Sequence, residues 1–385
     1  MFDEKIIIPS LINPTHLTFD DDFNSEVKNL PYSITHLTFG NNFNQSVNNL
    51  PKKIQVLTFG KSFNQSIDNL PDSITHLTLG GNFNQVIHKL PNSLTHLIFY
   101  GGIYNSKFNR KINKYPDGLT HITFGCDFDQ TVDNLPNNLK YLSFGSYFNQ
   151  SVDNLPNSID ILIFGSNFNQ SVNKLPTNLK ELYFGNGFNG NVDNLPSGLQ
   201  RLTFGVNFNK EINKLPPNLT HLKLGFMFDN DVNHLPNSLL SLSFDGLFNR
   251  SVENLPSKLQ ILTFGNHFNN PINKLPPNIK ILHFGDDFNQ YVDNLPQNLQ
   301  ILKFGCCFNQ DISNLPKRIT HIIFPDNSCF NKSINKLPNS VQYITLGYAY
   351  DKNICIFPRS LKEIKQMKKI LDCPDKYVAV DLYKN

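Results

Sequence analysis

Histidine recurs at one position of a short repeated string in the first third of the chain. Thr-His-Leu or Thr-His-Ile places it at His16, His36, His76, His96 and His121. If each histidine stands on a strand, neighbours in this column lie about 4.8 Å apart across a parallel sheet. Neutral imidazoles at that spacing suit a transition metal. A metal site, or an enzyme built on the last three residues (the histidine ladder), is therefore one hypothesis, and a duplicated polar surface position without a ligand is the other.

The same column changes character along the chain. After His121 it continues with Tyr141, and further on it becomes apolar over three repeats, which we name the isoleucine stripe: Ile261, Ile281 and Ile301. His283 and Lys303 stand two residues after stripe positions. Contiguous exposed apolar surface often marks a partner site, although the last coils or a terminal cap could instead bury it. We predict that the ladder with Tyr141, and the stripe with His283 and Lys303, are candidate partner-binding residues.

A repeat of about twenty residues must position these columns. Its most regular mark is proline, which recurs with only two changes of spacing at Pro31, Pro51, Pro71, Pro91, Pro116, Pro136, Pro156, Pro176, Pro196, Pro216, Pro236, Pro256, Pro276, Pro296, Pro316, Pro338 and Pro358. A fixed period of this length indicates a solenoid, in which each unit buries its apolar face only against its neighbours.

Each repeat predicts one short strand followed by a turn. Leu199 to Phe204 shows the Leu-x-x-Leu-x-Phe pattern, whose alternation of apolar and polar residues has the period of a strand. Gly follows, and then Phe-Asn, as in Phe43-Asn44. With 33 phenylalanines and no tryptophan, we expect the phenylalanines to form an internal spine. We expect the asparagine column to be buried and to satisfy backbone groups of neighbouring coils.

These motifs resemble two known families of repeats. The strand pattern is similar to the shortest leucine-rich repeats, and Phe43 to Pro51, which reads Phe-Asn-Gln-Ser-Val-Asn-Asn-Leu-Pro, resembles the FNIP repeat. The resemblance implies a mainly β, leucine-rich-repeat-like solenoid of about 17 short coils, with one parallel sheet along its concave face and a cap at each end. FNIP-repeat proteins are typical of social amoebae and of giant viruses that infect amoebae. Viral members often carry an F-box before the repeats; because the repeats of this sequence begin within the first twenty residues, we expect no F-box here.

The predicted organisation is a single elongated domain with three parts. Residues 1–20 are a degenerate first repeat or cap, 21–358 are the solenoid, and 359–385 are a C-terminal cap. In the cap, Ser360 to Leu371 has apolar residues at helical spacing behind a favourable N-cap, which predicts a helix. Tyr377 to Val380 predicts a final strand. Insertions at 100–107 and 325–329 follow a strand, so both are expected to project from the same edge.

Composition and motifs reduce the number of partners and cellular locations that fit this sequence. The net charge of +3 disfavours nucleic acid as a partner, and neither a secretory signal nor a membrane-spanning stretch is predicted. The six cysteines have no metal or redox spacing. Glycosylation acceptor strings start at several asparagines of the column expected to be buried, among them Asn44, Asn64, Asn149 and Asn169. Thiols and buried acceptor sites together favour the cytoplasm of an amoeba or an infected host cell.

We expect a non-enzymatic scaffold, because no phosphate-binding loop, nucleophile elbow or Cys/His pair is present. The expected scaffold is a monomer that binds a protein along its concave strand face, and needs no cofactor. One alternative is a substrate adaptor that associates with a ubiquitin ligase but has no F-box of its own. The other is the metal-binding protein or enzyme that would use the histidine ladder.

Overall fold

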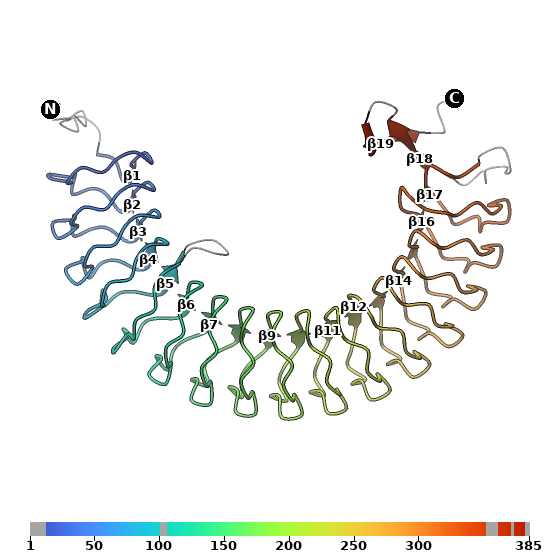
Figure 1. The fold of residues 1–385 in the computed structure, drawn as a ribbon, viewed down its shortest axis with the longest axis horizontal. Coiled ribbons are helices and arrows are strands. Elements are labelled where there is room, and N and C mark those ends of the chain that lie inside the picture. Colours follow the sequence, from blue (N-terminus) through green and yellow to red (C-terminus); the bar gives the residue numbers. More distant parts are fainter. Residues whose placement is uncertain (1–12, 101–105, 352–360, 371–372, 382–385) are drawn as a thin grey trace. The chain divides into compact units, whose positions relative to one another are not determined.

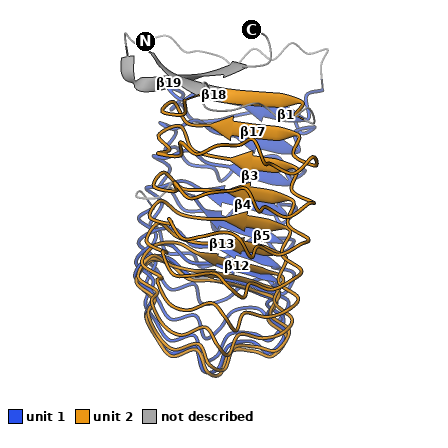
Figure 2. Cartoon of the chain, turned by 90° about the vertical axis from the view of Figure 1, so that its right-hand side faces the viewer, with its two compact units in different colours: residues 1–185 blue, residues 186–385 orange. Residues whose placement is uncertain are grey.

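The computed structural model describes residues 13–100, 106–351, 361–370 and 373–381 of the chain. Two compact units can be distinguished, residues 1–185 and 186–385, which Figure 2 shows in different colours. The described residues contain strands and turns and no helix. Each unit is a stack of coils, where a coil is one copy of the repeat with its strand.

The described residues of the first unit form nine short strands, each on its own coil. Neighbouring strands pair in parallel and keep the same column in register, so that His76 pairs with His96 and His96 with His121. The strands are β1 (His16–Thr18), β2 (His36–Thr38), β3 (Val56–Thr58), β4 (His76–Leu79), β5 (His96–Phe99), β6 (His121–Thr123), β7 (Tyr141–Ser143), β8 (Ile161–Ile163) and β9 (Glu181–Tyr183).

The second unit repeats this arrangement and adds a longer terminal pair of strands. Its parallel strands are β10 (Arg201–Thr203), β11 (His221–Leu224), β12 (Ser241–Phe244), β13 (Ile261–Thr263), β14 (Ile281–His283), β15 (Ile301–Lys303), β16 (His321–Ile323), β17 (Tyr343–Leu346) and β18 (Glu363–Ile370). The last strand, β19 (Cys373–Asp381), pairs with β18 in the antiparallel sense. Within each unit, the strands lie on the inner side of the curved stack (Figure 1). The predicted solenoid and its parallel strands are therefore confirmed.

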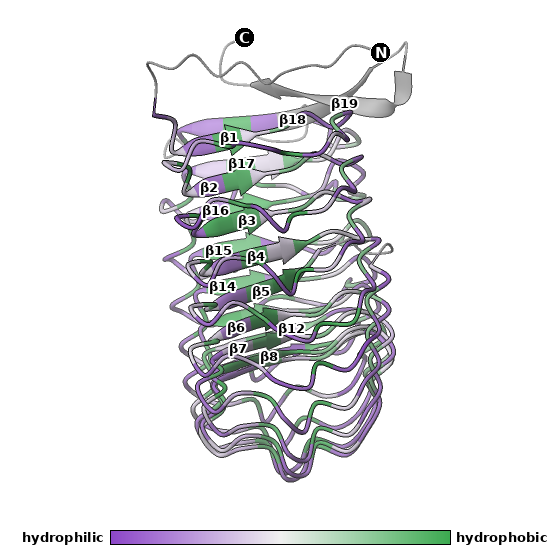
Figure 3. Cartoon of the chain, turned by 90° about the vertical axis from the view of Figure 1, so that its left-hand side faces the viewer, coloured by the Kyte–Doolittle hydropathy of each residue, from purple (hydrophilic) through white to green (hydrophobic). Residues whose placement is uncertain are grey.

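The period-two pattern fixes which side chains point inward. Leu142, in the middle of β7, is fully buried, whereas Tyr141 and Ser143 on either side of it are only half-buried. This alternation recurs on the other short strands. Figure 3 shows the result as hydrophobic strand segments between mainly hydrophilic turns. The strand face, which we define as the outward first and third residues of each strand, is thus the surface on which side chains can vary.

Phenylalanine forms the predicted spine. Within one coil, the rings of Phe144 and Phe148 stack with their centroids 3.7 Å apart and their planes 8° from parallel. Between coils, Phe148 stacks on Phe168 at 6.1 Å, and Phe144 on Phe164 at 5.8 Å. Phe148 and Phe168 are fully buried. Stacked rings therefore connect each coil to its neighbours, which explains why phenylalanine appears about twice in each repeat.

The asparagine column forms the predicted ladder, but it is not buried. The Asn169 backbone N–H donates to Asn149 Oδ1 at 2.9 Å, and the Asn149 N–H donates to Asp129 Oδ1 at 2.8 Å. These bonds occupy backbone donors for which the turns supply no strand partner. However, Asn149 is half-buried and Asn169 is exposed, as Asn44 and Asn64 are half-buried. The prediction of buried asparagines was wrong, because the column lies at the rim of each coil, where neighbouring coils cover it from two sides only.

Glycine after the strand is required by the close approach of adjacent coils. A Cβ atom added to Gly145 would overlap the carbonyl group of Gly125 in the preceding coil. Any side chain there would push the two coils apart, so the residue is set by packing rather than by chemistry.

The predicted helix in the C-terminal cap was wrong. Ser360 lies outside the described residues, and the segment after it forms strand β18, in which Ile364 pairs with Ile344 of β17. Leu361 and Ile364 are buried, as the two leucines of Leu-x-x-Leu are in other coils. Pairing with the open edge of β17 therefore overrides the local helical spacing. The predicted final strand is confirmed by β19.

Backbone hydrogen bonds join both insertions to the preceding coil. Tyr100 N–H donates to Leu79 O and Lys107 N–H donates to Gly81 O, both at 2.7 Å, while residues 101–105 lie outside the described residues. At the second insertion, Cys329 N–H donates to Cys306 O at 2.7 Å. The residue before the last of each insertion is a buried serine, Ser106 or Ser328. Whether both project from one edge stays a prediction.

We predict that Phe148→Ala lowers the free energy of unfolding by about 3–5 kcal/mol, because it leaves a cavity in the spine. Lys140→Ala in the same coil should cost about 1 kcal/mol or less, since its ion pair with Asp160 is long, at 3.9 Å, and solvent-exposed. Urea unfolding followed by circular dichroism measures both. Equal losses for the two variants would contradict the assignment of inward and outward positions.

Candidate functional site

The structure brings the predicted ladder residues together on the strand face of the first unit. His76, His96 and His121 are the first residues of β4, β5 and β6, and parallel pairing places them directly side by side. Tyr141 follows on β7 in the same register. His76 is exposed, and the other three are half-buried.

The three imidazoles form a stack of nearly parallel rings. The ring centroids of His76 and His96 are 4.1 Å apart with their planes 12° from parallel, and those of His96 and His121 are 4.2 Å apart at 10°. Tyr141 extends the column at 5.8 Å from His121. A shorter stack joins His16 and His36, with centroids 4.1 Å apart. The strand spacing thus produces an aromatic column.

The threonine before each histidine engages one ring nitrogen. Thr95 Oγ1 lies 3.0 Å from Thr75 O and 2.9 Å from His96 Nδ1. Thr120 and His121 repeat this geometry. Because Thr75 O also accepts the Thr95 and His96 backbone N–H groups, the single hydroxyl proton can go to this carbonyl, with Nδ1 as the donor to Oγ1, or to Nδ1 itself. In either tautomer Nδ1 is engaged by the threonine, and Nε2 is the ring nitrogen left for other contacts.

This geometry does not favour a shared metal ion. The lone pair of each Nε2 lies in its ring plane, and planes only 10–12° from parallel do not converge on one point. In the part of the chain that the structure describes, no group of three or more His, Cys, Asp or Glu side chains could hold a metal ion. The ladder residues are therefore together, but they are stacked rather than arranged around a centre.

Stacking also makes protonation of the ladder unfavourable. Burial, with help from the neighbouring His121 and His76, lowers the pKa of His96 from 6.5 to about 4. Burial and His76 likewise lower the pKa of His121. Both effects disfavour the charged imidazolium. The centre of the ladder is thus an uncharged surface at neutral pH.

The isoleucine stripe lies on the strand face of the second unit. Parallel register aligns Ile261 with Ile281 and Ile281 with Ile301. Ile261 is 38% exposed, and the other two are half-buried. None of the three belongs to the core, whereas Leu282 between the outward positions of β14 is fully buried. The alternative that terminal coils bury the stripe is not seen among the described residues.

Cationic side chains border the stripe. His283 on β14 is aligned with Lys303 on β15, which is exposed. Burial and the adjacent Lys303 lower the pKa of His283, so that lysine supplies the charge on this side. On the other side, exposed Lys280 directly precedes β14, and its Nζ donates to Gln260 Oε1 at 3.1 Å. The stripe is thus an apolar row between two basic positions.

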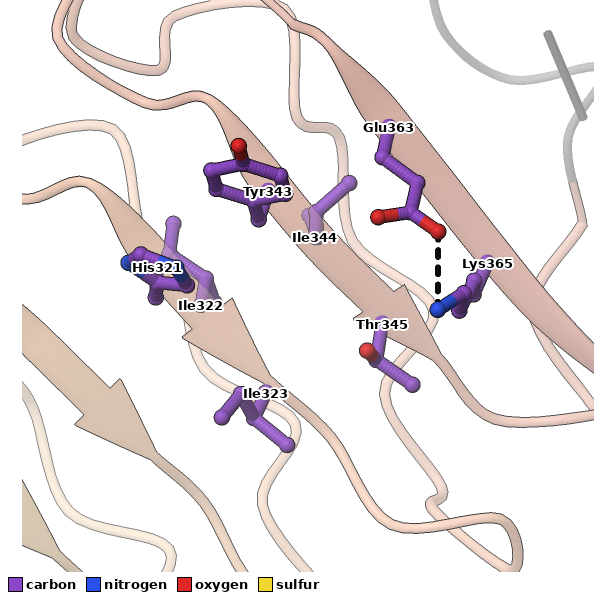
Figure 4. A pocket seen from close by; sticks show the side chains of 8 residues that line it. All are labelled: His321, Ile322, Ile323, Tyr343, Ile344, Thr345, Glu363 and Lys365. Carbon is purple, nitrogen blue, oxygen red and sulfur yellow. Dashed lines mark ion pairs between the residues drawn. The ribbon is translucent and has the colours of Figure 1, made fainter. Parts of the chain in front are cut away.

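Sequence reasoning missed a hollow at the C-terminal end of the same strand face. It has a volume of about 190 Å³ and is lined by residues of β16, β17 and β18. Figure 4 shows Tyr343 beside His321, with ring centroids 4.6 Å apart, and the Glu363–Lys365 ion pair at 2.7 Å. The only signal in the sequence was Leu361-x-x-Ile364, which marks β18 as another coil.

Comparisons with known proteins agree with this architecture. The FNIP repeat model matches more than half of the chain, at residues 23–62, 43–82, 63–102, 83–127, 108–147, 128–154, 148–187, 188–227, 268–307 and 291–327. No curated protein matches the sequence. Among the described residues, none forms a helix that is long and apolar enough to cross a membrane.

Two solved structures show the same type of fold. CroV588, a giant-virus protein described as a novel circular LRR protein, is 38% identical with a TM-score of 0.78 over 92% of this chain and 63% of that chain. The present chain therefore spans less than two thirds of the length of CroV588. YopM from Yersinia enterocolitica is 16% identical with a TM-score of 0.51, over 92% of this chain and 91% of that chain, and supports the fold alone.

We predict that acid destabilises the first unit through the ladder. Because the folded-state pKa of His96 is about 4 and its usual value is 6.5, the unfolded state binds more protons between these values. The contribution of neutral His96 to stability is complete above about pH 6.5 and is lost as pH falls towards 4. The unfolding temperature should therefore fall less between pH 7 and 4.5 in His96→Gln than in the wild type.

The control is His234→Gln, an exposed histidine outside the ladder, which should keep the wild-type fall in unfolding temperature. An NMR titration of the His96 ring gives the pKa directly. Titration near 6.5 would show that the stack does not disfavour protonation.

Proposed function

This chain belongs to the FNIP repeat family, and from that premise we propose that it is a non-enzymatic scaffold that binds a protein partner along its strand face. Leucine-rich-repeat-like folds are typical of protein interaction scaffolds. The observation that carries the proposal is the isoleucine stripe, a contiguous apolar row in an outward column.

The contrast between inward and outward columns supports this role. At the inward position, the three strands β13, β14 and β15 carry Leu262, Leu282 and Leu302, all fully buried. At the outward position the same strands carry isoleucine in three consecutive coils, whereas most other coils have histidine, tyrosine, serine, glutamate or arginine there. The repeat does not need an apolar residue there, because the coils with polar residues keep the same register. Partner binding explains the exposed apolar stripe, which the packing of the coils does not require.

The border of the stripe indicates the chemistry of the partner. Lys280 and Lys303 lie on opposite sides of the apolar row, so an apolar partner segment with carboxylates beside it would be both desolvated and charge-matched.

We further propose that the scaffold is a monomer and works in the cytoplasm of an amoeba or an infected host cell. The six cysteines, which have no paired metal or redox spacing, support the proposal of a reducing compartment.

We predict that Ile281→Asp leaves the fold intact but removes partner binding. The outward position tolerates polar residues in other coils, so the unfolding temperature should stay within a few degrees of the wild type. Pull-downs from amoebal lysate, compared by quantitative mass spectrometry, should show partners that are retained by the wild type and depleted at least tenfold with Ile281→Asp. Ubiquitin-ligase components among them would specify an adaptor.

The matched control is Ile161→Asp, which changes an isoleucine of the same column on β8, away from the stripe. It should retain the partners. Equal recovery of all proteins by both variants would refute the stripe as the binding site, and unfolding of Ile281→Asp would show that the stripe belongs to the core.

A further inference from the structure

A second exposed apolar cluster lies at the turns that follow the strands of the second unit. Val206, Phe226, Met227 and Leu247, which we name the turn patch, are 37%, 37%, 42% and 38% exposed. They occupy the first or second residue after the glycine position in three consecutive coils. The corresponding turns on either side of the patch carry Asn186 and Asn266. Apolar residues are therefore not a requirement of the turn.

Backbone bonds hold the four side chains in adjacent coils. Met227 N–H donates to Val206 O at 2.8 Å, and Leu247 N–H donates to Phe226 O at 2.7 Å. These are the bonds that join the same turn in other coils. The patch is consequently continuous over three coils, and its members occupy fixed positions on the ordered turns.

Phe226 extends the patch by one more coil because its neighbour has no side chain. A Cβ atom added to Gly246 would overlap the Phe226 ring, so the ring lies over that glycine. Beyond it, the ring meets His267 edge-on, with ring centroids 6.4 Å apart and planes at 85°. Phe226 thus spans the width of a coil while it remains more than one third exposed.

Carboxylates border the patch. Asp245 directly precedes Gly246, and its half-exposed side chain lies 3.4 Å from Lys223 Nζ. In the coil after His267, Asp286 and Asp287 are both exposed, and Asp287 Oδ2 lies 2.8 Å from His267 Nδ1. The charge beside this apolar surface is therefore opposite to the charge beside the isoleucine stripe.

We propose that the turn patch is a second docking surface, for a segment of a partner protein that presents apolar side chains next to lysine or arginine. Burial of the four apolar side chains supplies the binding energy, and the exposed carboxylates of Asp286 and Asp287 select a cationic flank over an acidic one. The inference goes beyond the strand-face function, because it concerns a different edge of the coils and a partner of opposite charge.

The test uses two fluorescein-labelled heptapeptides with the same Leu-Phe-Leu centre, one with two lysines and one with two glutamates at each end. Fluorescence polarisation with the full-length Ile281→Asp variant, which removes the isoleucine stripe as an alternative site for the glutamate peptide, should show at least tenfold tighter binding of the lysine peptide. The preference should shrink in high salt. Phe226→Asp should weaken binding of the lysine peptide at least tenfold.

Three controls make the outcome decisive. Tyr147→Ser changes an exposed aromatic residue of the same turn in the first unit and should bind the lysine peptide normally. The wild-type chain should bind the lysine peptide as tightly as Ile281→Asp does, which separates this site from the strand face. Leu247→Asp replaces Phe226→Asp if circular dichroism shows that the latter is unfolded. Equal binding of the two peptides, no effect of either patch variant, or self-association through the patch in sedimentation experiments would overturn the proposal.

Discussion

Stacking between neighbouring coils is the interaction on which the rest of this structure depends. A single coil contributes a strand of three or four residues and two phenylalanines, which is too little to form a core. Its rings become buried only because the next coil repeats them, as Phe148 is covered by Phe128 and Phe168 at 6.2 and 6.1 Å. The asparagine ladder adds a polar connection at the rim, in the same direction. Stability therefore accumulates along the stack.

The same constraint determines where function can reside. Because coils stack in register, any residue type that recurs at an outward position becomes a continuous row. Histidine in this column gives stacked rings whose planes are nearly parallel, so their nitrogens do not converge on one metal ion. Because burial and the neighbouring histidines disfavour protonation of His96, the centre of the stack is uncharged at neutral pH. Isoleucine gives an apolar row, and the turns of the second unit give another at Phe226 and Leu247. These rows differ in their charged borders, so one chain offers surfaces with distinct preferences.

Much of this arrangement could be predicted from the sequence, because the same residue types recur at the same positions in many repeats. The spine at Phe144 and Phe148, the ladder through Asn149 and the register of the histidines all follow from periodicity. Errors arose where one residue type is compatible with two environments. Asn169 makes the predicted hydrogen bond to Asn149, but it is exposed rather than buried. The segment from Leu361 has apolar residues at helical spacing, but it forms a strand that pairs with the edge of β17.

The turn patch was missed for a different reason. Val206, Phe226 and Leu247 do not share a single column, so no periodic signal connects them. Their proximity depends on the backbone bonds between turns and on the missing side chain of Gly246. Similarly, the Thr95 hydroxyl lies between Thr75 O of the preceding coil and His96 Nδ1, a contact that no pattern of residue types reveals.

A double-mutant cycle tests most directly whether neighbouring coils stabilise one another through the spine. Phe148→Leu is combined with Phe168→Leu in the adjacent coil, or with Phe63→Leu four coils away in the same unit, and native-state hydrogen exchange at the Phe144 amide reports the free energy of opening. Nearest-neighbour stacking predicts a coupling of about 0.5 kcal/mol or more for Phe148 with Phe168, and additivity within about 0.3–0.5 kcal/mol for Phe148 with Phe63. Additive effects in both pairs would contradict the account.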